Sequence, residues 1–93
     1  MSNEGLKYAH NEELIRRMAR NVAEYRKVKG YTQLDLANEA DIGLAQIKRI
    51  ETAGVNTSIS SAYRIALALE RSVDDLLRPY DETIRIIESE IES

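Results

Sequence analysis

The sequence has no cysteine and a single histidine, and these two scarcities exclude several kinds of chemistry. Without cysteine there is no disulfide bond and no thiolate nucleophile, and His10 alone cannot form a His/Cys cluster that would hold zinc. The four glycines are scattered and form no phosphate-binding loop. We therefore expect a protein that is not an enzyme, with no metal site and no cofactor.

Long apolar runs are also missing. A membrane-spanning helix needs about 20 consecutive apolar residues, and no segment approaches that length. Residues 1–10 lack the apolar stretch of a signal peptide. The sequence thus predicts a cytoplasmic protein without a membrane contact, and 93 residues fit one domain of ordinary size.

Charge is distributed unevenly along the chain. The formal net charge is −3. Residues 78–93 carry two basic residues against five acidic ones, whereas residues 16–49 carry eight Lys/Arg against four Asp/Glu. The placement of basic residues governs attraction to phosphates more than the total charge does. The acidic total therefore does not exclude a nucleic-acid-binding surface in the first half of the chain.

Apolar residues recur at helical spacing along most of the sequence, and one proline interrupts them. After a flexible N-terminus over residues 1–10, Asn11 is expected to cap a first helix that stops at Gly30. Further helices are predicted at 33–40, 44–52, 58–69 and 72–77. Thr32, Ser58 and Ser72 are expected to cap the second, fourth and fifth helices, and Gly54 is expected to end the third. The fold class is therefore all-α, with five helices in a domain over residues 11–78.

An additional C-terminal helix is expected over residues 79–93, with Pro79 at the boundary and Asp81 as its cap. Within the domain, Leu34, Leu36 and Ala37 are available for packing in the second helix. Ile47 and Ile50, three residues apart, should face inward in the third helix. The buried face of the fourth helix is expected to contain Ile59, Ala62, Ile65, Ala66 and Leu69.

The segment Asp41-Ile42-Gly43 joins two short helices by a tight turn. A helix fits the major groove of B-DNA, and a preceding helix that crosses the backbone holds it there. Ala37 is small enough to let the two helices approach, and Ile42 places an apolar side chain in the angle between them. The pattern indicates a helix-turn-helix, although an ordinary helical hairpin fits the periodicity equally well.

The residues at these positions carry a resemblance to a known family. The pattern T-Q-x-x-L-A at 32–37 is followed by I-x-x-x-x-I-x-R-I-E at 42–51. The segments Asn56 to Leu69 and Ser72 to Leu77 continue the match. Over residues 18–77 the chain resembles the lambda-repressor/Cro-like (XRE-type) helix-turn-helix transcriptional regulators. The resemblance implies a five-helix lambda-repressor-like domain that binds double-stranded DNA. No pocket for a small-molecule ligand is apparent from the sequence.

The resemblance also implies which residues form the DNA-binding surface. They are Thr32, Gln33, Gly43, Leu44, Ala45, Gln46, Lys48, Arg49, Asn56 and Thr57. Gln33 would bond a phosphate or a neighbouring recognition side chain, and the Asn56–Thr57 segment would contact the DNA backbone. Arg26 and Glu51 match a family pair that forms an internal salt bridge between the first and third helices. Arg49 would contact DNA or join that pair.

Two positions depart from the family pattern. Asp41 stands where the family often has glycine, and aspartate tolerates the left-handed conformation that this turn needs. Gly43 stands where serine or threonine is common, so a capping hydroxyl is missing. Leu44 and Ala45 replace polar readers, and they can pack on thymine methyl groups but cannot hydrogen-bond to bases. Polar readout would then depend mainly on Arg49, which pairs best with guanine.

The apolar stripe of the last helix predicts a homodimer. A dimer is expected because a single small DNA-reading domain makes too few contacts for tight specific binding. The expected interface consists of Leu14 on the first helix and of Ile84, Ile87 and Ile91 on the last. The alternative for the same stripe is intramolecular packing on the first helix, near Leu14 and Ile15. The function that we expect is a transcriptional repressor that binds a palindromic operator. An antitoxin or other protein-interaction module, or a restriction-modification controller protein, is the alternative.

Overall fold

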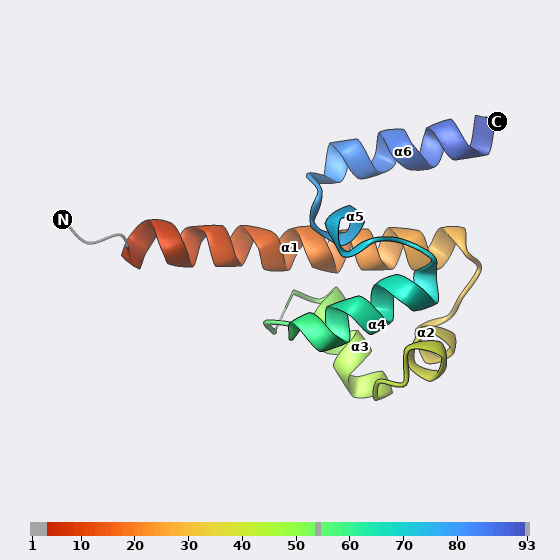
Figure 1. Cartoon of the computed structure of the whole chain (residues 1–93), viewed down its shortest axis with the longest axis horizontal. Helices are drawn as coiled ribbons and strands as arrows, with labels where there is room; N and C mark the ends of the chain where they lie inside the picture. Colours follow the sequence, from red (N-terminus) through yellow and green to blue (C-terminus); the bar gives the residue numbers. More distant parts are fainter. Residues whose placement is uncertain (1–3, 54, 93) are drawn as a thin grey trace.

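The computed structural model describes residues 4–53 and 55–92, with side chains from Glu12 onward. All regular secondary structure in these residues is helical, as expected: α1 (Glu4–Val28), α2 (Gln33–Ala40), α3 (Leu44–Glu51), α4 (Ile59–Leu69), α5 (Val73–Leu77) and α6 (Tyr80–Glu92). In Figure 1, α1 runs through the middle of the molecule, with α2, α3 and α4 on one side and α6 on the other. None of the described helices is both long and apolar enough to cross a membrane.

The first helix starts well before the predicted cap. α1 begins at Glu4, so residues 4–10, expected to be flexible, are helical, and Asn11 lies inside the helix. The cap prediction is wrong because residues 6–10 contain no proline or glycine and include strong helix formers. At the other end α1 stops at Val28, and Gly30 has φ 80°, a left-handed conformation that glycine adopts without strain.

Three predicted caps are confirmed. The Thr32 hydroxyl accepts a hydrogen bond from the Asp35 amide at 3.0 Å, and the Thr32 amide donates back to the Asp35 carboxylate at 2.8 Å. Ser72 and Asp75 make the same reciprocal pair at the start of α5. The hydroxyl of Ser58 caps α4. The third helix ends at Glu51 with Thr52 as its C-cap, and Gly54, predicted to end it, lies outside the described residues.

The core lies where α1, α2, α3, α4 and α5 meet. Its largest fully buried apolar side chains are Tyr25, Leu36, Ile47, Ile50, Ile65, Leu76 and Val22. Two predictions are wrong, because Leu34 and Ile59 are exposed. Leu34 lies away from the buried face of α2, which Leu36, Ala37 and Ala40 form. Ile59 is the first residue of α4, where no neighbouring helix covers it.

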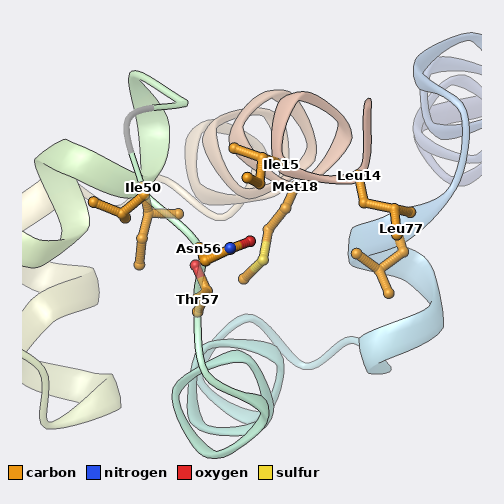
Figure 2. Close-up of a pocket in the computed structure, with 8 residues that line it drawn as sticks. Leu14, Ile15, Met18, Ile50, Asn56, Thr57 and Leu77 are labelled. Atoms are coloured by element: carbon orange, nitrogen blue, oxygen red, sulfur yellow. The ribbon is translucent and has the colours of Figure 1, made fainter. Parts of the chain in front are cut away.

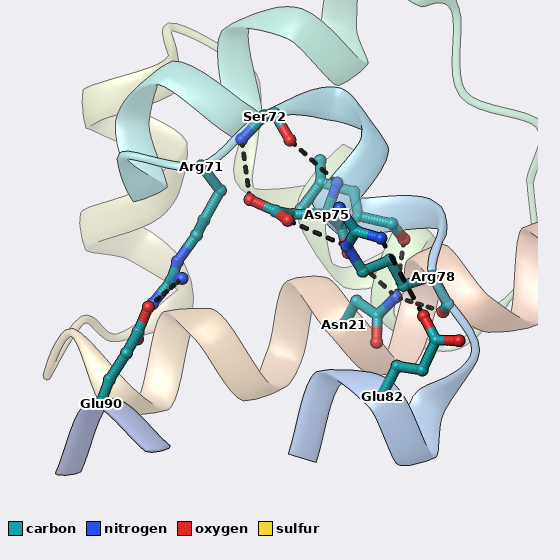
Figure 3. A network of polar contacts seen from close by, with 8 residues as sticks. Asn21, Arg71, Ser72, Asp75, Arg78, Glu82 and Glu90 are labelled. Carbon is teal, nitrogen blue, oxygen red and sulfur yellow. Dashed lines mark hydrogen bonds and ion pairs between the residues drawn. The ribbon is translucent and has the colours of Figure 1, made fainter. Parts of the chain in front are cut away.

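A buried asparagine attaches the short helix α5 to α1. The Asn21 amide nitrogen donates to the carbonyl oxygens of Leu76 and Arg78, each at 2.9 Å. Figure 3 shows this side chain beneath the last turn of α5, beside the ion pair of Arg78 with Asp75. These bonds satisfy carbonyl groups at a helix end that has no partners of its own. They fix the point at which the chain turns towards α6.

The last helix packs on α1 of the same chain. The hydroxyl of Tyr80, the first residue of α6, donates to the Glu24 carboxylate of α1 at 3.1 Å. Arg71, between α4 and α5, donates to the Glu90 carboxylate of α6 at 2.7 Å. α6 begins at Tyr80, so Asp81 is in its first turn and the prediction that it caps the helix is wrong. The Pro79 carbonyl accepts the first amide bonds of α6 instead.

Candidate nucleic-acid interface

A two-point ion pair joins the ends of α1 and α3. Arg26 donates from Nε to Glu51 Oε2 at 2.7 Å and from Nη2 to Glu51 Oε1 at 3.0 Å. The two side chains are only 12% and 7% exposed. Arg26 also donates to the carbonyl oxygen of Tyr31, at 2.9 Å. The guanidinium therefore ties the end of α3 both to α1 and to the segment that leads into α2.

The first turn of α2 adds a third side chain to this brace. Gln33 Nε2 donates to Glu51 Oε1 at 3.1 Å. This partner belongs to the buried brace, so the bond is neither the phosphate contact nor the contact with a recognition side chain that was expected for Gln33. Thr32, one residue earlier, uses its hydroxyl oxygen as the α2 cap. Its hydroxyl proton can still be donated to an acceptor outside the chain.

The turn between α2 and α3 has the geometry that its residues favour. Asp41 has φ 55° and ψ 50°, the left-handed conformation expected of it. Gly43 is the N-cap of α3, at φ −62°, and makes no side-chain cap bond. A Cβ added at Gly43 would meet no atom within 4 Å. Glycine is therefore not required at this position by conformation or by space.

The outward face of α3 consists of three exposed residues, Ala45, Lys48 and Arg49. They are spaced as neighbours on one side of a helix. Gln46 is half-buried beside them, and Leu44 is half-buried because it packs against the core. Of the two apolar residues predicted to meet thymine methyl groups, only Ala45 is fully exposed.

The two cations of this face are available for an external partner. Arg49 takes no part in the Arg26–Glu51 pair, which was the alternative role for it. Among the described residues its Nε donates only to the Ala45 carbonyl, at 3.4 Å. Neither Lys48 nor Arg49 makes an ion pair with any residue that the structure describes. A pair of unneutralised cations on an exposed helix face attracts anions such as phosphates.

The Asn56–Thr57 segment reaches the start of α4 beside α1. Asn56 is exposed and Thr57 is half-buried. Both line an apolar pocket of about 170 Å³ with Leu14, Ile15, Met18, Ile50, Val55 and Leu77 (Figure 2). No sequence pattern indicated this pocket, because its lining residues come from α1, α3, the following loop and α5.

The residues predicted to form the dimer interface do not lie together. Leu14 lines the pocket beside Leu77, whereas α6 contacts α1 around Glu24. Ile87 is buried within the monomer, Ile84 is half-buried, and Ile91 is exposed. The intramolecular packing that was the alternative for α6 is therefore present, although against a different part of α1 than Leu14 and Ile15.

Sequence reasoning missed one residue that extends the outward face of α3 beyond the end of the helix. Thr52 follows α3, is exposed, and its hydroxyl donates to the Arg49 carbonyl at 3.0 Å. Its spacing from Ala45 and Lys48, seven and four residues, is the signal that could have placed it there. The hydroxyl oxygen remains an acceptor on the same face.

Residues 22–76 of the chain match a family model described as helix-turn-helix, and this segment contains the two short helices, the left-handed turn and the outward second helix described above. The chain belongs to the XRE-type helix-turn-helix family. The matched segment is more than half of the chain and runs from Val22 in α1 to Leu76 in α5. The family resemblance predicted from residues 18–77 is therefore confirmed.

Two solved structures share the helix-turn-helix fold. One is a hypothetical transcription factor from Neisseria, 26% identical, with a TM-score of 0.72 over 78% of this chain and 84% of that chain. The other is a restriction-modification controller protein from Aeromonas hydrophila, 22% identical, with a TM-score of 0.65 over 67% of this chain and 94% of that chain. No curated protein matches the sequence.

Proposed function

We propose that this protein is a sequence-specific transcription regulator, a repressor that binds a palindromic operator in double-stranded DNA as a homodimer. The observation that carries the proposal is the outward face of α3. It presents Lys48 and Arg49 without an ion pair to any described residue, on a helix whose end is held by the buried Arg26–Glu51 pair. A reading helix needs both features, free donors and a fixed orientation.

Each exposed residue of the surface has a distinct role in this proposal. Arg49 donates to a base edge, with guanine as its preferred partner, and Ala45 packs on a thymine methyl group. Lys48 contacts a phosphate as a point charge. Gln46, half-buried at the edge of the face, assists the polar contact with bases, and Leu44 at the start of the helix assists the packing on thymine methyl groups.

The segments that flank α3 supply contacts to the DNA backbone. Thr32 and Gln33 lie at the start of α2, and Asn56 and Thr57 lie just before α4. Amide groups at the N-terminus of a helix favour phosphate oxygens. Contacts of this kind position the reader without carrying sequence information. Gly43 adds a backbone amide at the start of α3.

The homodimer follows from the size of the surface. A single reading helix contacts few base pairs, and two-fold dimers double that number at half-sites about one helical turn apart. A dimer seated on an operator excludes other proteins from the same DNA, which is the physical basis of repression. In this proposal the protein is a non-enzymatic DNA-binding regulator.

Selection of bound sequences from a random DNA pool tests the proposal. We expect enrichment of one motif, with guanine and thymine in each half and the halves inverted about 10 base pairs apart. A pool that stays random after repeated rounds would contradict sequence-specific binding. An enriched motif without inverted halves would keep the DNA-binding function and reject the palindrome.

A further inference from the structure

An apolar stripe lies uncovered along α4. Ile59, Tyr63 and Leu67 are 86%, 56% and 57% exposed. They recur every fourth residue, so they share one side of the helix. The opposite side of α4 is the core face, where Ala62, Ile65, Ala66 and Leu69 are buried. Large apolar side chains gathered on one exposed side of a helix mark an interaction surface more often than single ones do.

The chain's own helices leave this stripe uncovered. α6, which could have packed elsewhere, lies on α1, as Ile87 and the Tyr80–Glu24 hydrogen bond show. In Figure 1, α6 and α4 are on opposite sides of α1. The stripe is therefore available to another molecule.

The pattern of the stripe is symmetric about Tyr63. If a second α4 packs antiparallel to the first, Tyr63 meets its equivalent, and Ile59 meets Leu67 of the other copy at both ends. A two-fold interface requires this kind of self-complementarity, because each patch must fit its own copy. A stable protein–protein interface covers about 800 Å² per partner. The apolar stripe would form the centre of this area, and polar neighbours such as Ser60 would form its rim.

Charge on α4 is compatible with self-association. The helix sequence, ISSAYRIALAL, contains no acidic residue and one basic residue, Arg64. The Arg64 guanidinium donates to the Asp41 carbonyl of its own chain at 3.2 Å. No residue of the stripe is charged, so two copies can approach without repulsion at the centre, where interfaces are depleted of charge.

We infer that the α4 stripe is the homodimer surface and that a second copy of this chain packs on it with α4 antiparallel. The inference rests on the proposed function in one respect, since a two-fold dimer is what a palindromic operator requires. The stripe begins two residues after Thr57, so the dimer surface would be continuous with the proposed DNA-backbone contacts. Pairing at α4 would fix the spacing of the two α3 helices.

Sedimentation of four variants of the full chain, without DNA, tests the inference. Ile59→Glu and Leu67→Lys each place a charge at one end of the stripe. A glutamate in the first turn of α4 is favourable for the helix, so folding should be retained, and circular dichroism checks this in every variant. The matched control is Ile91→Glu, because Ile91 is 72% exposed but lies on α6. The fourth variant combines Ile59→Glu with Leu67→Lys.

We expect the wild type and Ile91→Glu to sediment as dimers. Each stripe variant should raise the dimer dissociation constant by about 100-fold, because each substitution occurs twice in a symmetric interface. The double variant should recover most of the affinity, since the new glutamate faces the new lysine of the other copy. Loss of the dimer in Ile91→Glu alone, unchanged dimers in both stripe variants, or a monomeric wild type would overturn the inference.

The outcomes separate this inference from the proposed function. If random-pool selection enriches no motif but the stripe variants dissociate the dimer, DNA reading fails and the α4 interface stands. If a motif is enriched and the stripe variants remain dimeric, the reader stands and the α4 interface is rejected. A folded Leu67→Lys monomer should still bind an isolated half-site as the wild type does.

Discussion

Arg26, near the end of α1, and Glu51, the last residue of α3, form a two-point ion pair that sets how the reading helix sits on the rest of the domain. Both side chains are largely buried. The fork of the guanidinium and the plane of the carboxylate fix direction as well as distance. Gln33 binds the same carboxylate, so the start of α2 and the end of α3 are linked through one group.

Breaking this pair should be costly. Glu51→Gln keeps the shape of the side chain but leaves the Arg26 charge buried without a counter-charge. We expect a loss of about 3 kcal/mol in the free energy of unfolding, measured by urea denaturation. The matched control is Arg85→Gln, which removes an exposed i,i+4 pair with Asp81 and should change stability by less than about 0.5 kcal/mol. Equal losses in the two variants would show that the buried pair is not a brace.

Gly43 offers a stabilising substitution. It caps α3 without a side-chain hydrogen bond, its φ is −62°, and the space around its Cα is open. Gly43→Ser should supply the missing hydroxyl and reduce the freedom of the unfolded chain. We expect the free energy of unfolding to rise by about 1 kcal/mol, measured by thermal unfolding. Gly43→Ala separates the two effects, since it provides only the second. A serine variant less stable than the alanine variant would contradict the cap.

The helices and their caps could be predicted because local chemistry determines them. Thr32 with Asp35, and Ser72 with Asp75, are signals that span four residues. The left-handed Asp41 follows from the conformations that aspartate tolerates. The prediction failed at Asn11, where a capping residue is followed and preceded by helix formers and the helix continues through it.

What the sequence could not predict depends on tertiary packing. Ile59 and Leu34 fit the apolar periodicity of their helices, but whether a residue is covered depends on the neighbouring helix. The same holds for the tail, whose isoleucines fit a dimer seam and an intramolecular contact equally well. In the candidate site, the outward position of Ala45, Lys48 and Arg49 on α3 agrees with the sequence prediction. The half-burial of Leu44 and the position of Thr52 were not predicted.

The carboxylate of Asp75, on α5, should make the stability of the fold depend on pH. Burial raises the pKa of this carboxyl, but the Ser72 hydrogen bonds and the Arg78 guanidinium lower it by more, so its pKa is below the usual range. A group with a depressed folded pKa contributes stability above its unfolded pKa of about 3.9, and that stability is lost as the pH falls through the folded pKa.

Urea denaturation at pH 5 and at pH 2 checks this expectation. Asp75→Asn should lose less stability than the wild type between the two pH values, because it has no carboxylate to protonate. Arg78→Gln should fall between them, since it removes one of the groups that lower the pKa. If Asp75→Asn loses as much stability as the wild type on acidification, this carboxylate is not the source of the pH dependence.

Lys48 should act through phosphate attraction alone. Lys48→Ala is expected to weaken binding to all DNA sequences by a similar factor and to reduce the slope of log affinity against log salt by about 1. Arg85→Ala, on α6, provides the control, because α6 lies on the far side of α1 from α3 (Figure 1). A Lys48→Ala variant that keeps the wild-type salt slope would exclude a phosphate contact at this position.

The role of Arg49 as the base reader is the central claim, and the most direct test is the base preference of Arg49→Ala, measured by random-pool selection beside the wild type and Arg85→Ala. A bidentate arginine–guanine contact is worth about 1–3 kcal/mol of discrimination. We expect Arg49→Ala to lose the preference for guanine at one position of each half-site, while Arg85→Ala selects the wild-type motif. An Arg49→Ala variant that selects the wild-type motif with unchanged affinity would contradict the claim.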